Sequence, residues 1–512
     1  MTHVTELLLR ICLFGVLLVV LRSIYQYITI ALPRNKLIRQ YGCKDAPRYP
    51  QKDSFLGLDI IRDGIRAVKT NCYLARVEQQ YKEYGNTFSF RFGTSVIINT
   101  NEPENIKTVL VTKSKDYGIG WRRKYAFSPL LGNSIILTDG AQWEHSRALL
   151  RPSFTRDQIN DLSTFEVHVA RLIQAIPRNG STVDLSGLFY RLTADVTTDV
   201  FFGESIQSLI EPKEEVMKAL HDSMEGGELR YLFGGIYSVI PQRRFYAAIK
   251  EVNDWIDGYV DRAMSKHASL AKENEEKQSI ELPAKDSERH VLLRELCRTT
   301  DDRDLIRDEI LSAFVGGRDT TGGLLGNLFF MLARKPDLWK RLRSEVEYLG
   351  GKAPTVGQLR SLSLVRDCVK ECKYSIFPAA TRGHMSLPFQ FEPRSHHCAS
   401  PALRLHPASP TNARTAYQDT ILPLGGGSDG NSPIFVPAGT TISWHVSALH
   451  RRKDLWGEDA DEFRTERWEH EREGWVSLSL CLSLAFQALT LTNISQKYLP
   501  FSKGPRVCIG RK

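Results

Sequence analysis

The sequence lacks the cysteine spacing of a disulfide framework. Its nine cysteines are scattered over 512 residues, and no two of them stand in a CxxC pattern. This usage suits a reducing compartment. The sequence also lacks a basic run interleaved with aromatic residues, so we expect no nucleic-acid partner. The net charge of +9 is moderate and fits a membrane surface or an acidic protein partner better.

An apolar segment opens the chain. Leu7 to Leu32 is mostly apolar and exceeds the roughly 20 residues that a membrane span needs. It lacks the small-residue cleavage site of a removed signal peptide. Pro33 is expected to end the helix, and the basic residues that follow place the rest of the chain in the cytosol: Arg34, Lys36 and Arg39. We predict an anchor at residues 1–33, with an amphipathic or buried helix as the alternative because Arg22 interrupts the run.

The body of the chain, residues 34–512, is longer than the usual single domain, although some large enzyme folds run this long as one unit. Residues 84–100 alternate in polarity and predict a β-hairpin with a turn at Gly93–Thr94. Glu102–Pro103 is typical of a helix start. From there to about Lys340 the periodicity is mainly helical. The expected fold class is therefore mainly α with a small β-sheet domain.

Two segments between the predicted helices have unusual composition. Met224 to Pro241 is apolar and punctuated by paired glycines, which predicts a loop between helices. Such a loop would dip into lipid and admit apolar substrate, or simply pack on the body. Residues 266–290 are rich in Lys and Glu and indicate a solvated linker.

The last dozen residues carry the pattern richest in chemistry. They run from Phe501 through Gly504, Arg506 and Cys508 to Gly510. A lone cysteine is usually buried and inert, but this spacing is typical of a loop that presents one thiolate. The run resembles the cysteine-ligand loop (F-x-x-G-x-R-x-C-x-G) of the heme-thiolate cytochrome P-450 superfamily, with every fixed position filled. The resemblance implies the superfamily's fold, heme b as cofactor, and Cys508 as the axial ligand of its iron.

Each fixed position of this loop has an implied role. The Cys508 thiolate would donate electron density that favours O–O cleavage. Gly504 would let the backbone turn where a Cβ would clash, and Gly510 would let the chain pass close beneath the porphyrin. Arg506 would pair with a heme propionate. Phe501 would shield the sulfur, because the surroundings of a ligand tune the metal.

Two further patterns match propionate-binding elements of the superfamily. Trp143 and Arg147 lie four residues apart, so they share a helix face. They resemble its W-x-x-x-R helix, whose two side chains bond a heme propionate. Alone, the pair would equally fit a surface arginine beside a packed tryptophan. Arg414 matches another propionate-binding arginine.

Paired glycines also stand in the middle of a predicted helix. Gly316 and Gly317 precede Asp319 and Thr320, and mid-helix glycines cost stability. The run resembles the superfamily's [A/G]-G-x-[D/E]-T-[T/S] motif over the distal heme face. Thr320 would hydrogen-bond the bound oxygen and Asp319 would relay protons. The alternative is a glycine-kinked packing helix whose Thr320 caps a local carbonyl.

Several stretches look like the fungal membrane-bound n-alkane and fatty-acid ω-hydroxylases: Phe202–Ser205, Gly316–Thr321, Asn412–Arg414, His450–Asp454 and Gly457–Phe463. This resemblance implies hydroxylation of a terminal carbon of an apolar substrate, with O2 and electrons from an NADPH-dependent cytochrome reductase. It also implies the endoplasmic reticulum membrane, with lipid around the anchor and the catalytic domain in the cytosol. A secondary-metabolite hydroxylase is one alternative, and a non-catalytic, misspliced or truncated product that does not retain heme is another.

The chain departs from the superfamily at its E-x-x-R helix, which with a second arginine forms a buried ion-pair network. Glu371 and Arg404 are 33 residues apart instead of three, and Arg467 matches the second arginine although Thr465 stands where proline is usual. The thirty residues 373–402 hold four prolines, which forbid a continuous helix. Without them the run becomes Glu371–Cys372–Leu403–Arg404, with the family spacing.

A second foreign stretch covers residues 476–496, and the chain stops at Lys512, where the family continues into a long helix. Our hypothesis is that all three anomalies are intron sequence translated in frame, since Val476–Ser477 can be encoded as a splice donor and Gln496 as an acceptor. The alternative is a genuine surface insertion, which costs little entropy. For the chain as written we predict weak or absent heme retention, which stoichiometric heme would contradict. A metal cluster in the first stretch (His384, His396, His397, Cys398) is not expected, because ligand-site spacing is missing.

Overall fold

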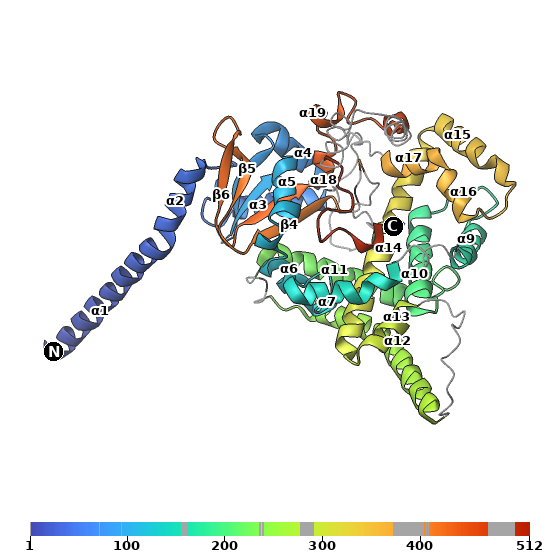
Figure 1. Ribbon diagram of the computed structural model, residues 1–512, viewed down its shortest axis with the longest axis horizontal. Helices are drawn as coiled ribbons and strands as arrows, with labels where there is room; N and C mark the ends of the chain where they lie inside the picture. Colours follow the sequence, from blue (N-terminus) through green and yellow to red (C-terminus); the bar gives the residue numbers. More distant parts are fainter. Residues whose placement is uncertain are drawn as a thin grey trace, which may run out of the picture.

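The computed structural model describes residues 2–70, 72–93, 95–154, 162–234, 237, 240–276, 291–371, 404–405, 407, 409–468 and 497–511. The two predicted inserts, 373–402 and 476–496, and the histidines of the first lie outside these residues. In Figure 1 the strands gather on one side of the molecule and most helices on the other. The expected fold class, mainly α with a small β region, is confirmed.

A helical arm opens the chain. Helix α1 (Thr2–Gln26) continues through a π-helical turn (Tyr27–Ala31) into α2 (Leu32–Tyr41). Residues Ile11–Tyr41 are long and apolar enough to cross a membrane, and Figure 1 shows α1 projecting away from the body. The prediction that Pro33 ends the helix is wrong: it lies in the first turn of α2, directly after the π-helical turn, and such a local change of hydrogen-bond register lets a helix accommodate proline. The helix ends instead at left-handed Gly42.

The larger sheet joins the two ends of the body. Its order is β1 (Thr87–Phe92), β2 (Ser95–Thr100), β7 (Thr441–His445), β4 (Thr411–Ala416) and β3 (Tyr117–Gly118). Strands β2 and β7 are parallel, and the other pairs are antiparallel. The predicted hairpin is confirmed, with Phe92 opposite Ser95. A smaller sheet pairs β5 (Thr420–Gly426) with β6 (Ser432–Val436).

Short helices surround the sheets. Helix α5 begins at the expected proline. The others come from both ends of the chain, and the five are α3 (Leu58–Lys69), α4 (Tyr73–Tyr84), α5 (Pro103–Lys107), α18 (Val446–Leu449) and α19 (Lys453–Trp456). A buried cluster under the sheets contains Ile442 and Trp444 of β7 together with Leu499, which directly precedes the cysteine loop. The sheet core therefore fixes the start of that loop.

The helical side is built around α14 (Arg303–Ala333), with Ile310, Leu311 and Phe314 fully buried. Helix α10 (Leu185–Phe202) packs along it. The remaining helices are α6 (Trp121–Leu131), α7 (Gly140–Leu150), α9 (Ser163–Ala175), α11 (Glu214–Phe233), α12 (Arg243–Glu276), α13 (Leu292–Thr299), α15 (Pro336–Val346), α16 (Val356–Ser361) and α17 (Ser363–Glu371).

Two segments predicted as irregular contain helix. Most of Met224–Pro241 belongs to α11, because its glycines serve helix packing rather than a turn. A Cβ on Gly226 would lie 2.3 Å from the Phe245 ring, and one on Gly227 would lie 2.6 Å from the Phe127 ring. Residues 266–276 of the predicted linker form the end of α12, and the rest of it lies outside the described residues.

Candidate active site

The cysteine loop turns at Gly504. Its φ is +71°, and a Cβ there would lie 1.9 Å from the carbonyl oxygen of Leu110. Two main-chain bonds close the loop: Val507 N–H donates to Gly504 O at 3.1 Å, and Cys508 N–H donates to Phe501 O at 2.9 Å. The Cys508 residue is exposed. Positive φ and close packing both require glycine at position 504, as predicted.

The other glycine of the loop is under no such constraint from the protein. A Cβ on Gly510 would lie 3.9 Å from both Cys508 Sγ and the Phe154 ring, an ordinary contact. Ile509, beside it, packs against the helical core that contains Phe314 of α14. The prediction that Gly510 passes beneath a porphyrin therefore rests on the cofactor alone.

Helix α7 brings the predicted Trp143 and Arg147 to the cysteine loop. Arg147 Nη1 donates to the carbonyl oxygen of Val507 at 3.0 Å. Guanidinium carbons of both Arg147 and Arg506 lie over the Trp143 ring, 5.5 Å and 4.6 Å from its centroid. Three residues predicted to hold propionates thus form one group.

An aspartate that the sequence reasoning missed completes this group. Arg506 Nη2 donates to Asp139 Oδ1 at 2.8 Å and to Thr138 O at 2.6 Å. The Tyr417 hydroxyl also donates to Asp139, at 2.5 Å. Asp139 stands directly before α7, at the N-cap site where a carboxylate is favoured, but its side chain makes no capping bond there, so the sequence carried no signal for these partners.

Arg414 lies on β4 with 6% of its surface exposed. It donates to Asn412 Oδ1 at 3.1 Å and to Ala413 O at 2.8 Å. Burial, together with the charges of Arg123 and Arg506, lowers the pKa of Arg414 to about 9. Among the described residues no carboxylate lies within ion-pair distance of it.

This cluster fits a heme. Its guanidinium groups, of which that of Arg414 is buried, outnumber the nearby carboxylate of Asp139, and a buried charge needs a partner of opposite sign. Two propionates would supply that negative charge. The exposed Cys508 thiol, in a loop fixed by Gly504 and Arg147, is a suitable ligand for iron.

Helix α14 carries the predicted Thr320 on an exposed face together with Gly316. The Thr320 hydroxyl donates to the Gly316 carbonyl at 2.7 Å, the local contact that the packing alternative also predicts. A Cβ on Gly316 would meet open space, whereas one on Gly317 would lie 3.0 Å from Thr197 of α10. One glycine thus packs and the other leaves room. Asp319 pairs with the neighbouring Arg318.

The predicted network is partly described. The Arg404 guanidinium is fully buried and donates to the carbonyls of residues 450, 460 and 462 at 2.7–2.9 Å. Arg467 pairs with Asp459 at 3.2 Å and also reaches the carbonyl of residue 462. The side chain of Glu371 lies outside the described part, so its pairing stays a prediction. The main chain brings the two sides of the 373–402 stretch together, because Arg404 N–H donates to Lys370 O at 3.0 Å.

Sequence reasoning also missed the role of His450, which is fully buried. Its Nε2 accepts from Leu499 N–H at 2.9 Å, so the ring carries its proton on Nδ1. Nδ1–H donates to Arg404 O at 2.7 Å. His450 therefore connects the arginine network to the cysteine loop.

Comparisons with known proteins agree with this geometry. A family model described as cytochrome P-450 matches residues 68–380 and 400–512. The cytochrome P-450 monooxygenase himC of Aspergillus japonicus is 36% identical over 501 residues, covering 97% of this chain and 80% of that protein. Cytochrome P-450 52A12 of Debaryomyces hansenii is 31% identical over 519 residues, covering 98% and 88%.

The solved structures agree on the fold. The crystal structure of the cytochrome P-450DA heme domain matches with a TM-score of 0.67 at 18% identity, covering 92% of this chain and 88% of that one. The resemblance drawn from the motifs is confirmed, including the likeness to fungal membrane-bound hydroxylases.

Proposed function

Because the chain belongs to the cytochrome P-450 family, with heme bound through a cysteine thiolate, we propose that it hydroxylates the terminal carbon of n-alkanes or fatty acids. Monooxygenase chemistry with O2, a reductase and a hydrophobic substrate is the family's general activity. The finer assignments, an NADPH-dependent cytochrome reductase and a membrane-supplied substrate, are part of the proposal. Similarity to 52A proteins at 31–34% identity supports the substrate class.

We assign Cys508 as the iron ligand and the arginine group as the propionate site. Thiolate-ligated heme, when bound, supplies the activation of dioxygen. Arg147 holds the loop through the Val507 carbonyl, and the buried Arg414 lacks a described carboxylate partner. The observation that carries the assignment is this convergence of the loop with Trp143 and two arginines.

Proton delivery is assigned to Thr320 and Asp319. The Thr320 hydroxyl lies on the exposed face of α14, where Gly316 leaves space for a small molecule. Asp319 is adjacent and is held by Arg318. A hydroxyl and a carboxylate placed together can pass a proton toward the reacting oxygen.

The apolar arm is proposed as a single-pass anchor in the endoplasmic reticulum membrane. Its basic flank supports a cytosolic body. A bidentate pair ties the arm to the smaller sheet: Arg34 Nε and Nη2 each donate to Asp419 at 2.8 Å. The active site is thereby held near the membrane surface, where apolar substrates concentrate.

The interruption at 373–402 is proposed as foreign to the fold. The family match is broken between residues 380 and 400. The bond from Arg404 N–H to Lys370 O spans 34 residues, and removing thirty leaves four, the α-helical spacing. The main chain thus supports an uninterrupted helix carrying Glu371 and Arg404. The stretch 476–496 stays a prediction.

The test uses the full-length chain with a microsomal NADPH reductase. Dodecane, dodecanoate and a ring compound are offered, and products are identified by mass spectrometry. Because weak heme retention is predicted for the chain as written, turnover is counted per bound heme. We expect ω-hydroxylated chains, and no product from C508A. Oxidation of the ring alone would favour the second candidate, a hydroxylase of ring metabolites. That candidate is kept because relatives named only as monooxygenases match at 36–37% identity.

A further inference from the structure

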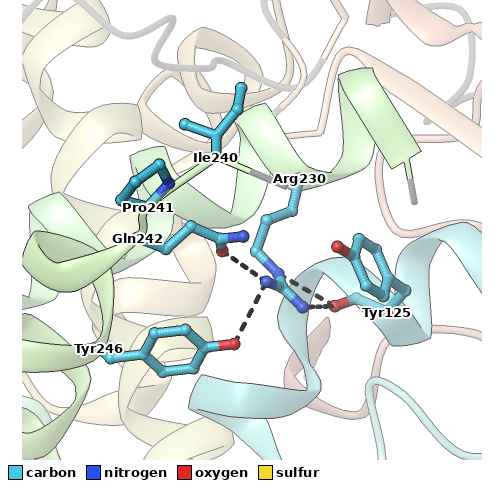
Figure 2. A pocket seen from close by; sticks show the side chains of 6 residues that line it. All are labelled: Tyr125, Arg230, Ile240, Pro241, Gln242 and Tyr246. Atoms are coloured by element: carbon cyan, nitrogen blue, oxygen red, sulfur yellow. Dashed lines mark hydrogen bonds between the residues drawn. The ribbon is translucent and has the colours of Figure 1, made fainter. Parts of the chain in front are cut away.

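A cavity of about 340 Å³ lies apart from the cysteine loop, between α6, α11 and α12. Its lining is Tyr125, Arg230, Ile240, Pro241, Gln242 and Tyr246, drawn in Figure 2. Ile240 and Tyr246 are 46% and 52% exposed, whereas Arg230 is only 5% exposed. The cavity is thus open at its rim and has a guanidinium at its floor.

The Arg230 guanidinium has only neutral partners. Nε and Nη2 both donate to the carbonyl oxygen of Tyr125, at 3.2 and 2.9 Å. Nη1 donates to Gln242 Oε1 at 2.6 Å and to the Tyr246 hydroxyl at 3.4 Å. Within the described part of the chain no carboxylate lies within ion-pair distance of it. A guanidinium has five N–H donors, and these partners leave one on Nη2.

A second donor in the same cavity is also unused. The Tyr125 hydroxyl is buried and has no hydrogen-bond partner among the described residues. A buried donor left unpaired costs about 1–3 kcal/mol. The same tyrosine ring lies under Arg230, 4.2 Å from the guanidinium carbon. A ligand that accepts hydrogen bonds and carries negative charge would satisfy both groups.

The surroundings add positive charge. Arg122 of α6 donates to the carbonyls of Phe92 and Tyr231 at 3.1 and 3.5 Å. Burial lowers its pKa, and no described carboxylate pairs with it. The seam between α6 and α11 therefore holds two guanidinium groups whose partners in the described part of the chain are all neutral. Such a site favours an anion.

We propose that this cavity binds the carboxylate of a long-chain acid substrate. The proposal rests on the proposed function, since it names the acid, not the alkane, as the substrate that the site recognises. The carboxylate accepts from the Tyr125 hydroxyl and the spare Nη2–H of Arg230. Helix α6 packs against both α11 and α14, and the proposal places the apolar tail of the acid along α6 toward α14. Fixing the acidic end directs the far end to the reaction.

The test compares acid with alkane in two variants of the full-length chain. Y125F removes a hydroxyl that no described residue uses, so the fold should be unaffected. R230M also removes the bonds to α6, so alkane turnover serves as its internal control. We expect KM for dodecanoate to rise at least about tenfold in both variants, while KM for dodecane is unchanged. Y81F, which removes another buried unpaired phenol in α4, is the matched control and should alter neither substrate.

Equilibrium dialysis with labelled dodecanoate and its methyl ester gives a readout independent of turnover. The wild type should bind the acid more tightly than the ester, and Y125F should remove the difference. Equal losses for acid and alkane would make Arg230 a structural residue and overturn the proposal, as would no change in either variant. Acid-selective binding without hydroxylation would retain the cavity assignment and reject the proposed function.

Discussion

Deleting residues 373–402 tests the geometry at the interrupted helix. The deletion joins Cys372 to Leu403 and extends α17 into Arg404. The two ends already lie together, because Arg404 N–H donates to Lys370 O at 3.0 Å. In the shortened chain this contact becomes an ordinary i to i−4 bond of one α-helix. We therefore expect the shortened chain to fold with the described structure unchanged.

The shortened chain should be more stable because of chain entropy. Holding the ends of a thirty-residue stretch together costs about (3/2)RT ln 30, or roughly 3 kcal/mol. Removing the stretch recovers this cost without breaking a described contact. We expect the free energy of unfolding to rise by about 3 kcal/mol and heme retained per chain to increase.

Helical phase supplies the matched controls. Deleting 372–402 or 374–402 removes one residue more or fewer, and each shift rotates Arg404 by about 100° around the helix. The guanidinium is fully buried against three carbonyls. Leaving a buried charge without partners costs about 3–5 kcal/mol, so both controls should be less stable than the thirty-residue deletion.

The assay is chemical unfolding followed by circular dichroism, with heme quantified in the purified proteins. Stability should peak sharply at thirty residues. Three deletions of equal stability would refute the helical continuity, because the register would then not matter. A thirty-residue deletion less stable than the full chain would show that the stretch contributes to the fold.

Three further results are expected. G504A should lose on the order of 3 kcal/mol in unfolding free energy, since its Cβ would lie 1.9 Å from Leu110 O. G510A should keep its stability in the absence of heme, so equal stability of the two variants would contradict the different roles of the two glycines. T320A should lower product formed per NADPH consumed about a hundredfold, and T320S should recover most of it; a matching loss in T320S would argue against a hydroxyl role. Burial raises the pKa of Glu309 to about 7. Its neutral form therefore stabilises the fold fully below pH about 4.5, and up to about 3 kcal/mol of unfolding free energy is lost as the pH rises through 7. E309Q should flatten this dependence of the unfolding free energy on pH, and an unchanged dependence would exclude Glu309 as its source.

The sequence predicted best where one local rule decided the outcome. Alternation around a Gly93–Thr94 turn specified the hairpin at 84–100, and the proline after Glu102 specified the start of α5. The cysteine loop could be predicted equally well, because the local φ of +71° at position 504 requires glycine. Its contact with Leu110 lies almost 400 residues away in sequence and could not be foreseen.

Predictions failed where packing overrode local propensity. The glycine pair Gly226–Gly227 was interpreted as a loop signal, yet both glycines lie in α11 because Phe245 and Phe127 occupy the space of their side chains. Asp139 and His450 were missed for a related reason. Each is an ordinary polar residue in sequence, and its partners come from distant segments that only the fold brings together.

A series of hydrogen bonds connects Lys370 and Arg404, the residues on either side of the interruption, to the cysteine loop. Lys370 O accepts from Arg404 N–H at 3.0 Å, Arg404 O accepts from His450 at 2.7 Å, and His450 accepts from Leu499 N–H at 2.9 Å. Leu499 lies two residues before Phe501, whose carbonyl receives Cys508 N–H. Any displacement of Arg404 is therefore transmitted to the loop that presents the thiolate. Heme retention and continuity of α17 should consequently change together, and H450A should separate them by lowering heme content while leaving α17 intact.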